Sequence, residues 1–302
     1  MKINFIGLIV FLIVSAFTIN RENKITIFMI GDSTMANRET QNGNLERGWG
    51  QMLSLFFTDN ICIENHAACG RSTLSFINEG RWKSVWEKLR PNDYVIIQFG
   101  HNDEKTDSTL HTIPGKTFDE NLRRFIRETR EKGAIPILLN AIVRRNFPPT
   151  PTTPHQYTYE KEGDVLVDSH GEYIKSPREV ARTEHVPFID MAALTFKLVA
   201  DLGPEKSKSL FMWIPEGKYP QYPNGKIDNT HLNVYGSRVI AGIAASEIVK
   251  AVPLLKPYYC PYGKGKHVPD CKNEISVCFN VSFVCQSCFS TGKLYRQWHS
   301  MV

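Results

Sequence analysis

The feature that most constrains the fold is an alternation of short apolar segments with longer amphipathic ones. Five segments are short and apolar, as buried strands are: Lys24 to Ile30, Ile61 to Asn65, Tyr94 to Phe99, Ile135 to Ala141 and Val186 to Ile189. Six have helical spacing: Gly48 to Phe57, Trp82 to Leu89, Phe118 to Lys132, Arg178 to Glu184, Ala192 to Leu202 and Tyr235 to Val249. Strands that alternate with helices pair in parallel through right-handed crossovers. We therefore predict an α/β fold, a parallel five-stranded sheet between two helical layers.

The residues that directly follow the predicted strands are small and polar. Gly31, Asp32 and Ser33 follow the first strand, Asn65 to Ser72 the second, and Gly100 to Asp103 the third. Ligands bind at the carboxyl ends of the strands in an open parallel sheet. A strand-to-helix turn with Gly and an N-cap residue would also explain the first group. The rest of the chain must therefore decide what these positions do.

The N-terminal segment has the pattern of an export signal. A Lys is followed by an apolar run from Ile3 to Phe17, and Val14 and Ala16 suit the −3 and −1 positions of a cleavage site. The run is shorter than the roughly 20 apolar residues of a membrane span. We interpret residues 1–19 as a signal peptide rather than a retained anchor, and we expect a secreted or periplasmic protein with no further membrane attachment.

The charge distribution argues against a nucleic-acid partner. The formal net charge is +5, but the segment from Pro257 onward has five Lys or Arg and two acidic side chains, so the rest of the chain carries only +2. That part also lacks a basic stripe with interleaved aromatic residues. We therefore exclude nucleic acid as a partner, and no feature of the sequence sets an oligomeric state.

Two segments interrupt the alternation and are predicted to be long loops. Residues Phe147 to Pro177 are rich in Pro and Thr, and residues 213–233 are rich in Pro, Gly, Trp and Tyr. Long loops in a compact domain commonly form the walls of a binding site. We expect both to border a site near the carboxyl ends of the strands.

The C-terminal tail differs in pattern from everything before it. It contains five of the seven Cys, namely Cys260, Cys271, Cys278, Cys285 and Cys288. Disulfides in an exported chain account for them better than a zinc site, because their spacing is irregular. We therefore divide the chain into a signal peptide (1–19), a main domain (20–256) and a tail (257–302) that we expect to be dispensable.

Five residues together match the needs of serine-dependent ester hydrolysis. That chemistry requires a nucleophile, a base oriented by an acid, and hydrogen-bond donors for the developing oxyanion. Ser33 can be the nucleophile, and His231 the base oriented by Asp228 three residues earlier. The backbone N–H groups of Ser33 and Gly70 and the side-chain amide of Asn102 can be the donors. Each residue has a structural interpretation by itself, but their placement after successive strands favours the catalytic one.

Four stretches of the chain resemble the sequence blocks of a known superfamily. In order, they read "IGDST", "NHAACGRSTLSF", "QFGHND" and "DNTHLN". They resemble the blocks of the SGNH or GDSL hydrolases, named for a Ser, a Gly, an Asn and a His. Within that superfamily, "GRSTLSFINEGRW" and "GHND" are most similar to the rhamnogalacturonan acetylesterases. The resemblance extends from about Lys24 to Leu255 and does not include the tail.

The resemblance implies a fold, an activity and residue roles. The implied fold is a flavodoxin-like three-layer α/β/α sandwich. The implied activity is that of a serine esterase, without a metal or other cofactor, that removes acetyl groups from pectic polysaccharide. Ser33 would be the nucleophile and an oxyanion donor, Gly70 and Asn102 the other oxyanion donors, and Asp228 and His231 the pair that acts as base.

Further polar and aromatic residues are candidates for substrate binding. We name Arg71, His101, Arg144, Arg145 and Trp213. A guanidinium binds the carboxylate of an acidic sugar through two hydrogen bonds, and an aromatic ring stacks on a sugar ring. Structural interpretations remain open, namely a solvated or capping Arg, loop packing for Trp213 and its neighbours Tyr219 and Tyr222, and a wall or backbone-orienting role for His101.

Two other functions are consistent with the same residues. One is a lipase or general short-acyl esterase. The loops argue against it, because they are polar and aromatic and show no long apolar segment for an acyl chain. The other is a non-catalytic sugar-binding protein, which would not need all five residues of the catalytic set.

Overall fold

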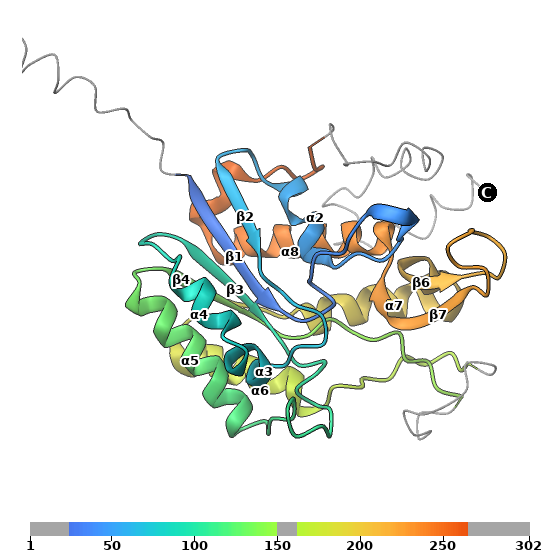
Figure 1. The fold of residues 1–302 in the computed structure, drawn as a ribbon, viewed down its shortest axis with the longest axis horizontal. Helices are drawn as coiled ribbons and strands as arrows, with labels where there is room; N and C mark the ends of the chain where they lie inside the picture. The colour runs from blue at the N-terminus through green and yellow to red at the C-terminus, as the bar shows by residue number, and fades with distance from the viewer. Residues whose placement is uncertain (1–23, 150–161, 265–302) are drawn as a thin grey trace, which may run out of the picture.

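The computed structural model of the protein describes residues 24–149 and 162–264 (Figure 1). The predicted signal peptide and the tail residues Cys271, Cys278, Cys285 and Cys288 lie outside these ranges. The strands are β1 (Ile25–Gly31), β2 (Ile61–Asn65), β3 (Tyr94–Gln98), β4 (Ile135–Leu139), β5 (Phe188–Ile189), β6 (Phe211–Ile214) and β7 (Lys226–Leu232). The α-helices are α2 (Trp49–Met52), α3 (Thr73–Asn78), α4 (Arg81–Trp86), α5 (Thr117–Glu131), α6 (Glu172–Glu184), α7 (Met191–Ser207) and α8 (Val234–Ala251). The 3₁₀ helices are η1 (Gln41–Gly43), η2 (Leu53–Phe56), η3 (Lys208–Leu210) and η4 (Pro253–Tyr258).

The first five strands form one parallel sheet in the order β2-β1-β3-β4-β5. The predicted fold class, a parallel five-stranded sheet in a three-layer α/β/α sandwich, is confirmed. The register pairs Gly31 with Gln98 and Gln98 with Leu139, so the strands end at the same edge. The segments after β1, β3 and β4 therefore begin side by side at this edge.

Both faces of the sheet are covered by helices, with one apolar cluster on each face (Figure 1). Successive side chains of a strand point to opposite faces. Ile27 and Met29 accordingly join the cluster of α8 and α2, whereas Phe28 and Ile30 join the cluster of α4, α5 and α6. Because β1 and β3 are covered on both faces, they are mainly apolar, with Thr26 and Gln98 as their polar residues.

Two helices differ from the prediction. Helix α3 was not predicted, although Ser72 and Ser75 form a capping box at its start. Helix α6 begins at Glu172 rather than Arg178, with Pro177 inside it. The predicted surface loop before it is also partly wrong, because Phe147 and Leu166 are buried in its described part. A Pro costs one helical hydrogen bond, and packing of Val180 and Ala181 in the core offsets that loss.

The second predicted loop contains a β-hairpin. Strands β6 and β7 form a separate antiparallel sheet, and the residues rich in Pro and Gly occupy only the connection between them. The tip of this connection packs on the segment before α2, where Tyr222 hydrogen-bonds Asn44 and Leu45. The hydroxyl of the half-buried Tyr222 therefore holds the connection on this segment, which is the loop-packing interpretation.

The chain continues to pack on the domain beyond residue 256. Tyr259 forms a β-bridge with Phe57, the Cys260 N–H donates to the Phe56 carbonyl at 2.9 Å, and the Lys264 N–H donates to the Leu55 carbonyl at 2.7 Å. The contacts of the domain thus extend to Lys264. Among the helices of residues 24–149 and 162–264, none has the length and hydropathy needed to cross a membrane.

Candidate active site

Ser33 lies in a tight turn at the end of β1. The Asp32 carboxylate accepts hydrogen bonds from the Thr34 N–H at 2.9 Å and the Thr34 hydroxyl at 2.8 Å, and the Asp32 carbonyl accepts from the N–H of Ala36 at 3.0 Å. Burial raises the pKa of Asp32, although the hydrogen bonds from Thr34 lower it. Asp32 therefore shapes the turn that presents the Ser33 hydroxyl at the edge of the sheet.

His231 and Asp228 reach Ser33 from β7. His231 Nε2 lies 3.0 Å from the Ser33 Oγ, and His231 Nδ1 lies 2.8 Å from Asp228 Oδ2. Burial opposes ionisation of Asp228, but hydrogen bonds and the charge from His231 outweigh it and hold the pKa of Asp228 well below its ordinary value. A carboxylate only accepts hydrogen bonds, so Nδ1 carries the proton and Nε2 is free to accept one from Ser33.

An irregularity in the hairpin explains why Asp228 and His231 face the same way. Side chains three apart on a regular strand point to opposite faces. Here Phe211 pairs with Leu232 while its neighbour Met212 pairs with Asp228, so the residues between bulge out of the ladder. A bulge re-aims side chains, and this one turns His231 back over the Asp228 carboxylate.

The segment that carries the expected oxyanion donor Gly70 contacts the end of β1, where the Ala68 N–H donates to the Gly31 carbonyl at 2.9 Å. Gly70 has a φ of +74°, a left-handed conformation that favours glycine, and an added Cβ would meet nothing within 4 Å. Backbone conformation rather than crowding by protein atoms thus explains this Gly. The Asn102 Nδ2 donates to the Arg71 carbonyl at 3.1 Å, which holds the amide next to Gly70. An amide nitrogen has a second hydrogen to donate.

Asp103 was not recognised in the sequence, although it directly follows Asn102. Its carboxylate accepts from the Thr73 N–H at 3.0 Å, the Thr73 hydroxyl at 2.5 Å and the Thr112 hydroxyl at 2.8 Å. Burial raises the pKa of Asp103 to about 7, although these hydrogen bonds lower it. Asp103 thereby ties the start of α3, close to Gly70, to the segment that carries Asn102.

Comparison with known proteins identifies the family. The sequence model of the GDSL-like lipase/acylhydrolase family matches residues 29–239. The chain belongs to this family. The resemblance seen in the sequence is confirmed, and the protein is a hydrolase that acts on ester bonds.

Several relatives within or near the family are similar over most of the chain. The rhamnogalacturonan acetylesterase RhgT of Bacillus subtilis is 34% identical over 81% of this chain and 98% of its own length. The rhamnogalacturonan acetylesterase of Emericella nidulans is 26% identical over 74% of this chain and 84% of its own. The crystal structure of the B. subtilis protein YxiM superposes with a TM-score of 0.59 at 26% identity, covering 75% of this chain and 56% of that one.

Arg145 was predicted to bind substrate, but its position in the structure does not support that role. Its side chain has no exposed surface. The guanidinium pairs with both oxygens of Glu162 at 2.5 and 2.6 Å, and donates to the Asn229 Oδ1 at 3.0 Å. Arg145 instead supports the bulge that carries His231, because Asn229 lies within it.

Trp213 also serves the hairpin. Its Nε1 donates to the Asn229 Oδ1 at 2.7 Å, and the cationic groups of Arg145 and Lys208 lie 4.7 and 4.5 Å from its ring centroid. The ring therefore packs within the protein, and the stacking interpretation is not supported.

Arg144, whose side chain is 28% exposed, contacts the buried His101 next to Asn102. The Arg144 Nε donates to His101 Nδ1 at 3.3 Å, and its Nη2 donates to the His101 carbonyl at 3.2 Å and pairs with Glu104 at 2.6 Å. Burial, with the nearby His170 and Arg144, holds the pKa of His101 well below its ordinary value. The Arg144 guanidinium thus holds the backbone next to Asn102, and Glu104 already supplies a carboxylate partner for it.

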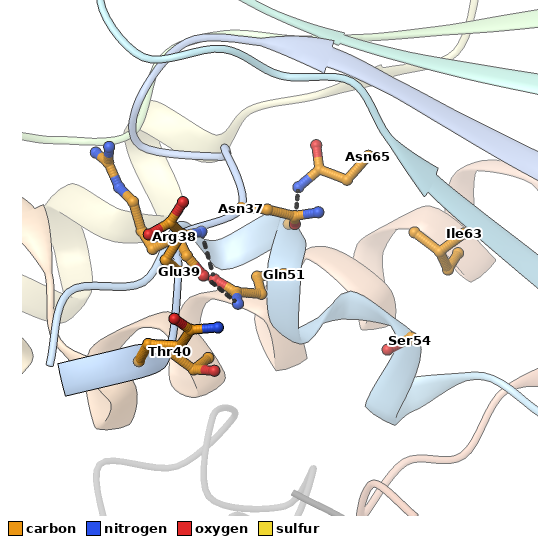
Figure 2. A pocket seen from close by; sticks show the side chains of 10 residues that line it. Asn37, Arg38, Glu39, Thr40, Gln51, Ser54, Ile63 and Asn65 are labelled. Atoms are coloured by element: carbon orange, nitrogen blue, oxygen red, sulfur yellow. Dashed lines mark hydrogen bonds between the residues drawn. The ribbon is translucent and has the colours of Figure 1, made fainter. Parts of the chain in front are cut away.

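Arg71 is the predicted substrate residue that lines an open pocket. Its Nε donates to both Glu79 oxygens at 3.1 and 3.0 Å, and about a third of the side chain is exposed. The pocket has a volume of about 570 Å³ and is also lined by Gly70, Leu74 and Thr109. A second pocket of about 610 Å³, lined mainly by polar side chains including Asn37, lies beside the segment after Ser33 (Figure 2).

Proposed function

We propose that the protein is a serine esterase that removes O-acetyl groups from an acetylated pectic polysaccharide of the rhamnogalacturonan type. The observation that carries the proposal is the hydrogen-bonded line from Asp228 through His231 to the Ser33 hydroxyl. Two of the similar relatives are rhamnogalacturonan acetylesterases by name, which supports the choice of substrate.

The geometry supports a two-step mechanism. His231 Nε2 takes the proton of Ser33 as the Ser33 Oγ attacks the acetyl carbonyl, and the ionised Asp228 stabilises the imidazolium. The N–H groups of Ser33 and Gly70 and the Asn102 amide bind the oxyanion. The imidazolium then protonates the departing sugar hydroxyl. Water activated by the same histidine releases acetate and frees Ser33.

The surroundings favour a small acyl group on a polar alcohol. The pocket beside Gly70 is lined by Arg71, Asn78, Glu79, Ser108 and Thr109, with Leu74 and Leu110 as its apolar side chains. Amide, hydroxyl and charged groups match sugar hydroxyls and carboxylates, whereas a long acyl chain needs an apolar channel.

We also propose that the protein is exported, on the pattern of residues 1–19. N-terminal sequencing of protein recovered from the medium or periplasm tests this, and a chain that still begins at Met1 would contradict it.

Acetate release tests the proposed activity. Wild-type protein, Ser33→Ala and the matched control Ser84→Ala are compared on acetylated rhamnogalacturonan, acetylated xylan and a long-chain aryl ester. We expect acetate from the pectic polymer with wild type and Ser84→Ala, and none with Ser33→Ala. Preferred turnover of the long-chain ester would indicate a lipase, and no turnover by folded wild-type protein would indicate a sugar-binding protein.

A further inference from the structure

Ion pairs connect the nucleophile segment to the hairpin that carries the base. The Arg38 Nη2 donates to the Ser33 carbonyl at 3.3 Å and pairs with Glu46 at 2.5 Å. The other oxygen of Glu46 accepts from the Lys226 Nζ at 2.9 Å. Lys226 is the first residue of β7. A charged path thus leads from the backbone of Ser33 to the hairpin.

The path continues to the catalytic acid. The Lys226 Nζ lies 3.5 Å from the Asp228 Oδ2, the same oxygen that accepts the His231 Nδ1–H at 2.8 Å. Oxygen atoms of Glu46 and Asp228 and a ring nitrogen of His231 all lie within 4.8 Å of one another. Both a cation and a second carboxylate therefore lie next to the Asp228–His231 pair.

These charges are shielded enough from water to act on the site. The side chains of Glu46 and Asp228 are 15% and 17% exposed, and those of Lys226 and His231 are 31% and 28% exposed. Charges at such distances interact more strongly in a partly buried site than at an open surface, and salt screens them less.

The cluster of Glu46, Asp228 and His231 is not arranged as a metal site. The Lys226 ammonium already lies between the two carboxylates, and each ring nitrogen of His231 has a protein partner. The position that a cation would take is filled by Lys226.

We propose that Glu46 and Lys226 are positioning residues that set the charge balance of the Asp228–His231 pair; this rests on the proposed function. When His231 accepts the Ser33 proton it becomes cationic. The Glu46 carboxylate stabilises that cation and the Lys226 ammonium destabilises it. Glu46 thus favours proton transfer to His231, and Lys226 opposes it.

The backbone keeps Glu46 next to β7 independently of its side chain. Glu46 forms an antiparallel bridge with Asn233, and the Arg47 N–H donates to the Leu232 carbonyl at 3.0 Å. Substitutions that change only the charge should therefore preserve the fold, which makes the proposal testable.

Charged and titratable groups face His231 from four segments. They are Asp228 and Lys226 on β7, Glu46 and Arg38 before α2, Asp32 at the end of β1, and His101 after β3. Only Glu46 and Lys226 are varied in the test, so the other charges are common to all variants.

The test compares Glu46→Gln, Lys226→Gln and the double variant. The readout is the midpoint of the acid limb of kcat/KM for p-nitrophenyl acetate, which reports protonation of the base in the free enzyme. We expect Glu46→Gln to move the midpoint to lower pH and Lys226→Gln to move it to higher pH, each by about one unit. The double variant removes one charge of each sign, so its midpoint should return close to that of wild type.

Conservative and remote variants serve as controls. Glu46→Asp and Lys226→Arg should retain most of the wild-type pH profile of kcat/KM, because they keep the charges. Glu247→Gln and Lys250→Gln break an ion pair on α8 and should leave the profile unchanged. Equal losses of rate at every pH with an unmoved midpoint, or single variants that move it in the same direction, would overturn the proposal.

A second readout separates this inference from the choice of substrate. Phosphonylation of Ser33 by a fluorophosphonate needs the base but no particular sugar, and its rate is followed against pH for the same variants. If Glu46→Gln and Lys226→Gln move the pH midpoint of labelling in opposite directions in a protein that releases no acetate from pectin, the inference is upheld and only the proposed substrate is overturned. A folded wild-type protein in which Ser33 is never labelled would overturn both.

Discussion

Arg145 hydrogen-bonds four other residues, and none of its side chain is exposed. Its partners are Glu162, Asn229, Ser207 and the Pro204 carbonyl. Glu162 is itself only 8% exposed. A buried ion pair contributes little net stability while intact, but loss of one partner leaves a charge without compensation. Loss of the Arg145 guanidinium would therefore leave the buried Glu162 carboxylate without a partner and destabilise the fold.

Replacing Arg145 should destabilise the fold strongly. We expect Arg145→Met to lower the free energy of unfolding by about 3 to 5 kcal/mol, and Arg145→Lys to recover only part, because Lys lacks the paired donors of a guanidinium. Chemical denaturation measures both. The double variant Arg145→Met/Glu162→Gln should be more stable than Arg145→Met alone.

The matched control is Arg182→Met, which removes an exposed pair with Glu179. It should change stability by less than about 0.5 kcal/mol. An Arg145→Met protein as stable as this control would contradict the role given to the buried pair.

Helix α3 and the segments around it are joined through Asp103 rather than through apolar packing alone. The carboxylate bonds Thr73 at the start of the helix and Thr112 in the segment before α5. Burial favours the neutral form of Asp103, so its pKa rises from 3.8 to about 7. Ionisation of Asp103 therefore affects the contacts among the start of α3, the segment after β3 and the segment before α5.

The stability of the protein should depend on pH through Asp103. Between about pH 4 and 7 the folded protein holds a proton on Asp103 that the unfolded chain has lost, so the unfolding free energy falls as pH rises through this window. Because the Asn side chain cannot ionise, Asp103→Asn should lack this pH-dependent decrease in the unfolding free energy, which we expect to be about 4 kcal/mol in wild type. Urea denaturation at both ends of the window measures it.

Asp201→Asn, on an exposed position of α7, is the control and should keep the wild-type pH dependence. Equal pH dependence of wild type and Asp103→Asn would show that Asp103 is ionised throughout the window.

Patterns along the chain were sufficient for some elements and residues. The five strands of the parallel sheet could be predicted because β1 and β3 are mainly apolar and amphipathic helices separate the strands. Ser33, Gly70 and Asn102 could be singled out because they lie in the segments that follow β1, β2 and β3. The β6–β7 hairpin was missed because the Pro and Gly of its connection outweighed two short strands.

Contacts between distant segments could not be predicted in the same way. Arg145 and Trp213 have the residue types that bind sugars, and only the fold reveals that they surround Asn229. Glu46 and Lys226 are 180 positions apart, and no local pattern links them. Burial and long-range pairing are properties of the packed chain, so residue type alone could not reveal them.

At the scale of the whole molecule, the C-terminal boundary of the domain follows from contacts and not from composition. The composition changes at Pro257, but Tyr259, Cys260 and Lys264 still pair with the segment Leu55 to Thr58. A cut at the change in composition would remove these hydrogen bonds.

Two truncations should therefore differ. We expect a chain that ends after Lys264 to keep wild-type esterase activity and Tm, so dispensability applies to residues 265–302 rather than, as expected from the sequence, to the whole tail from residue 257. A chain that ends after Leu255 should unfold at a temperature lower by roughly 5 to 10 °C, because several backbone hydrogen bonds of about 1 kcal/mol each are lost. Thermal unfolding and ester turnover of both chains provide the comparison. Loss of activity on removal of residues 265–302 alone would contradict dispensability.

The nucleophile and its base are 198 positions apart in the chain: Ser33 follows a strand of the parallel sheet, and His231 lies on a strand of the other sheet. His231 reaches Ser33 only where the β6–β7 hairpin packs at the edge of the parallel sheet. A chain in which the hairpin has left that edge has the nucleophile without its base. Ester turnover therefore reports that the two sheets are packed together.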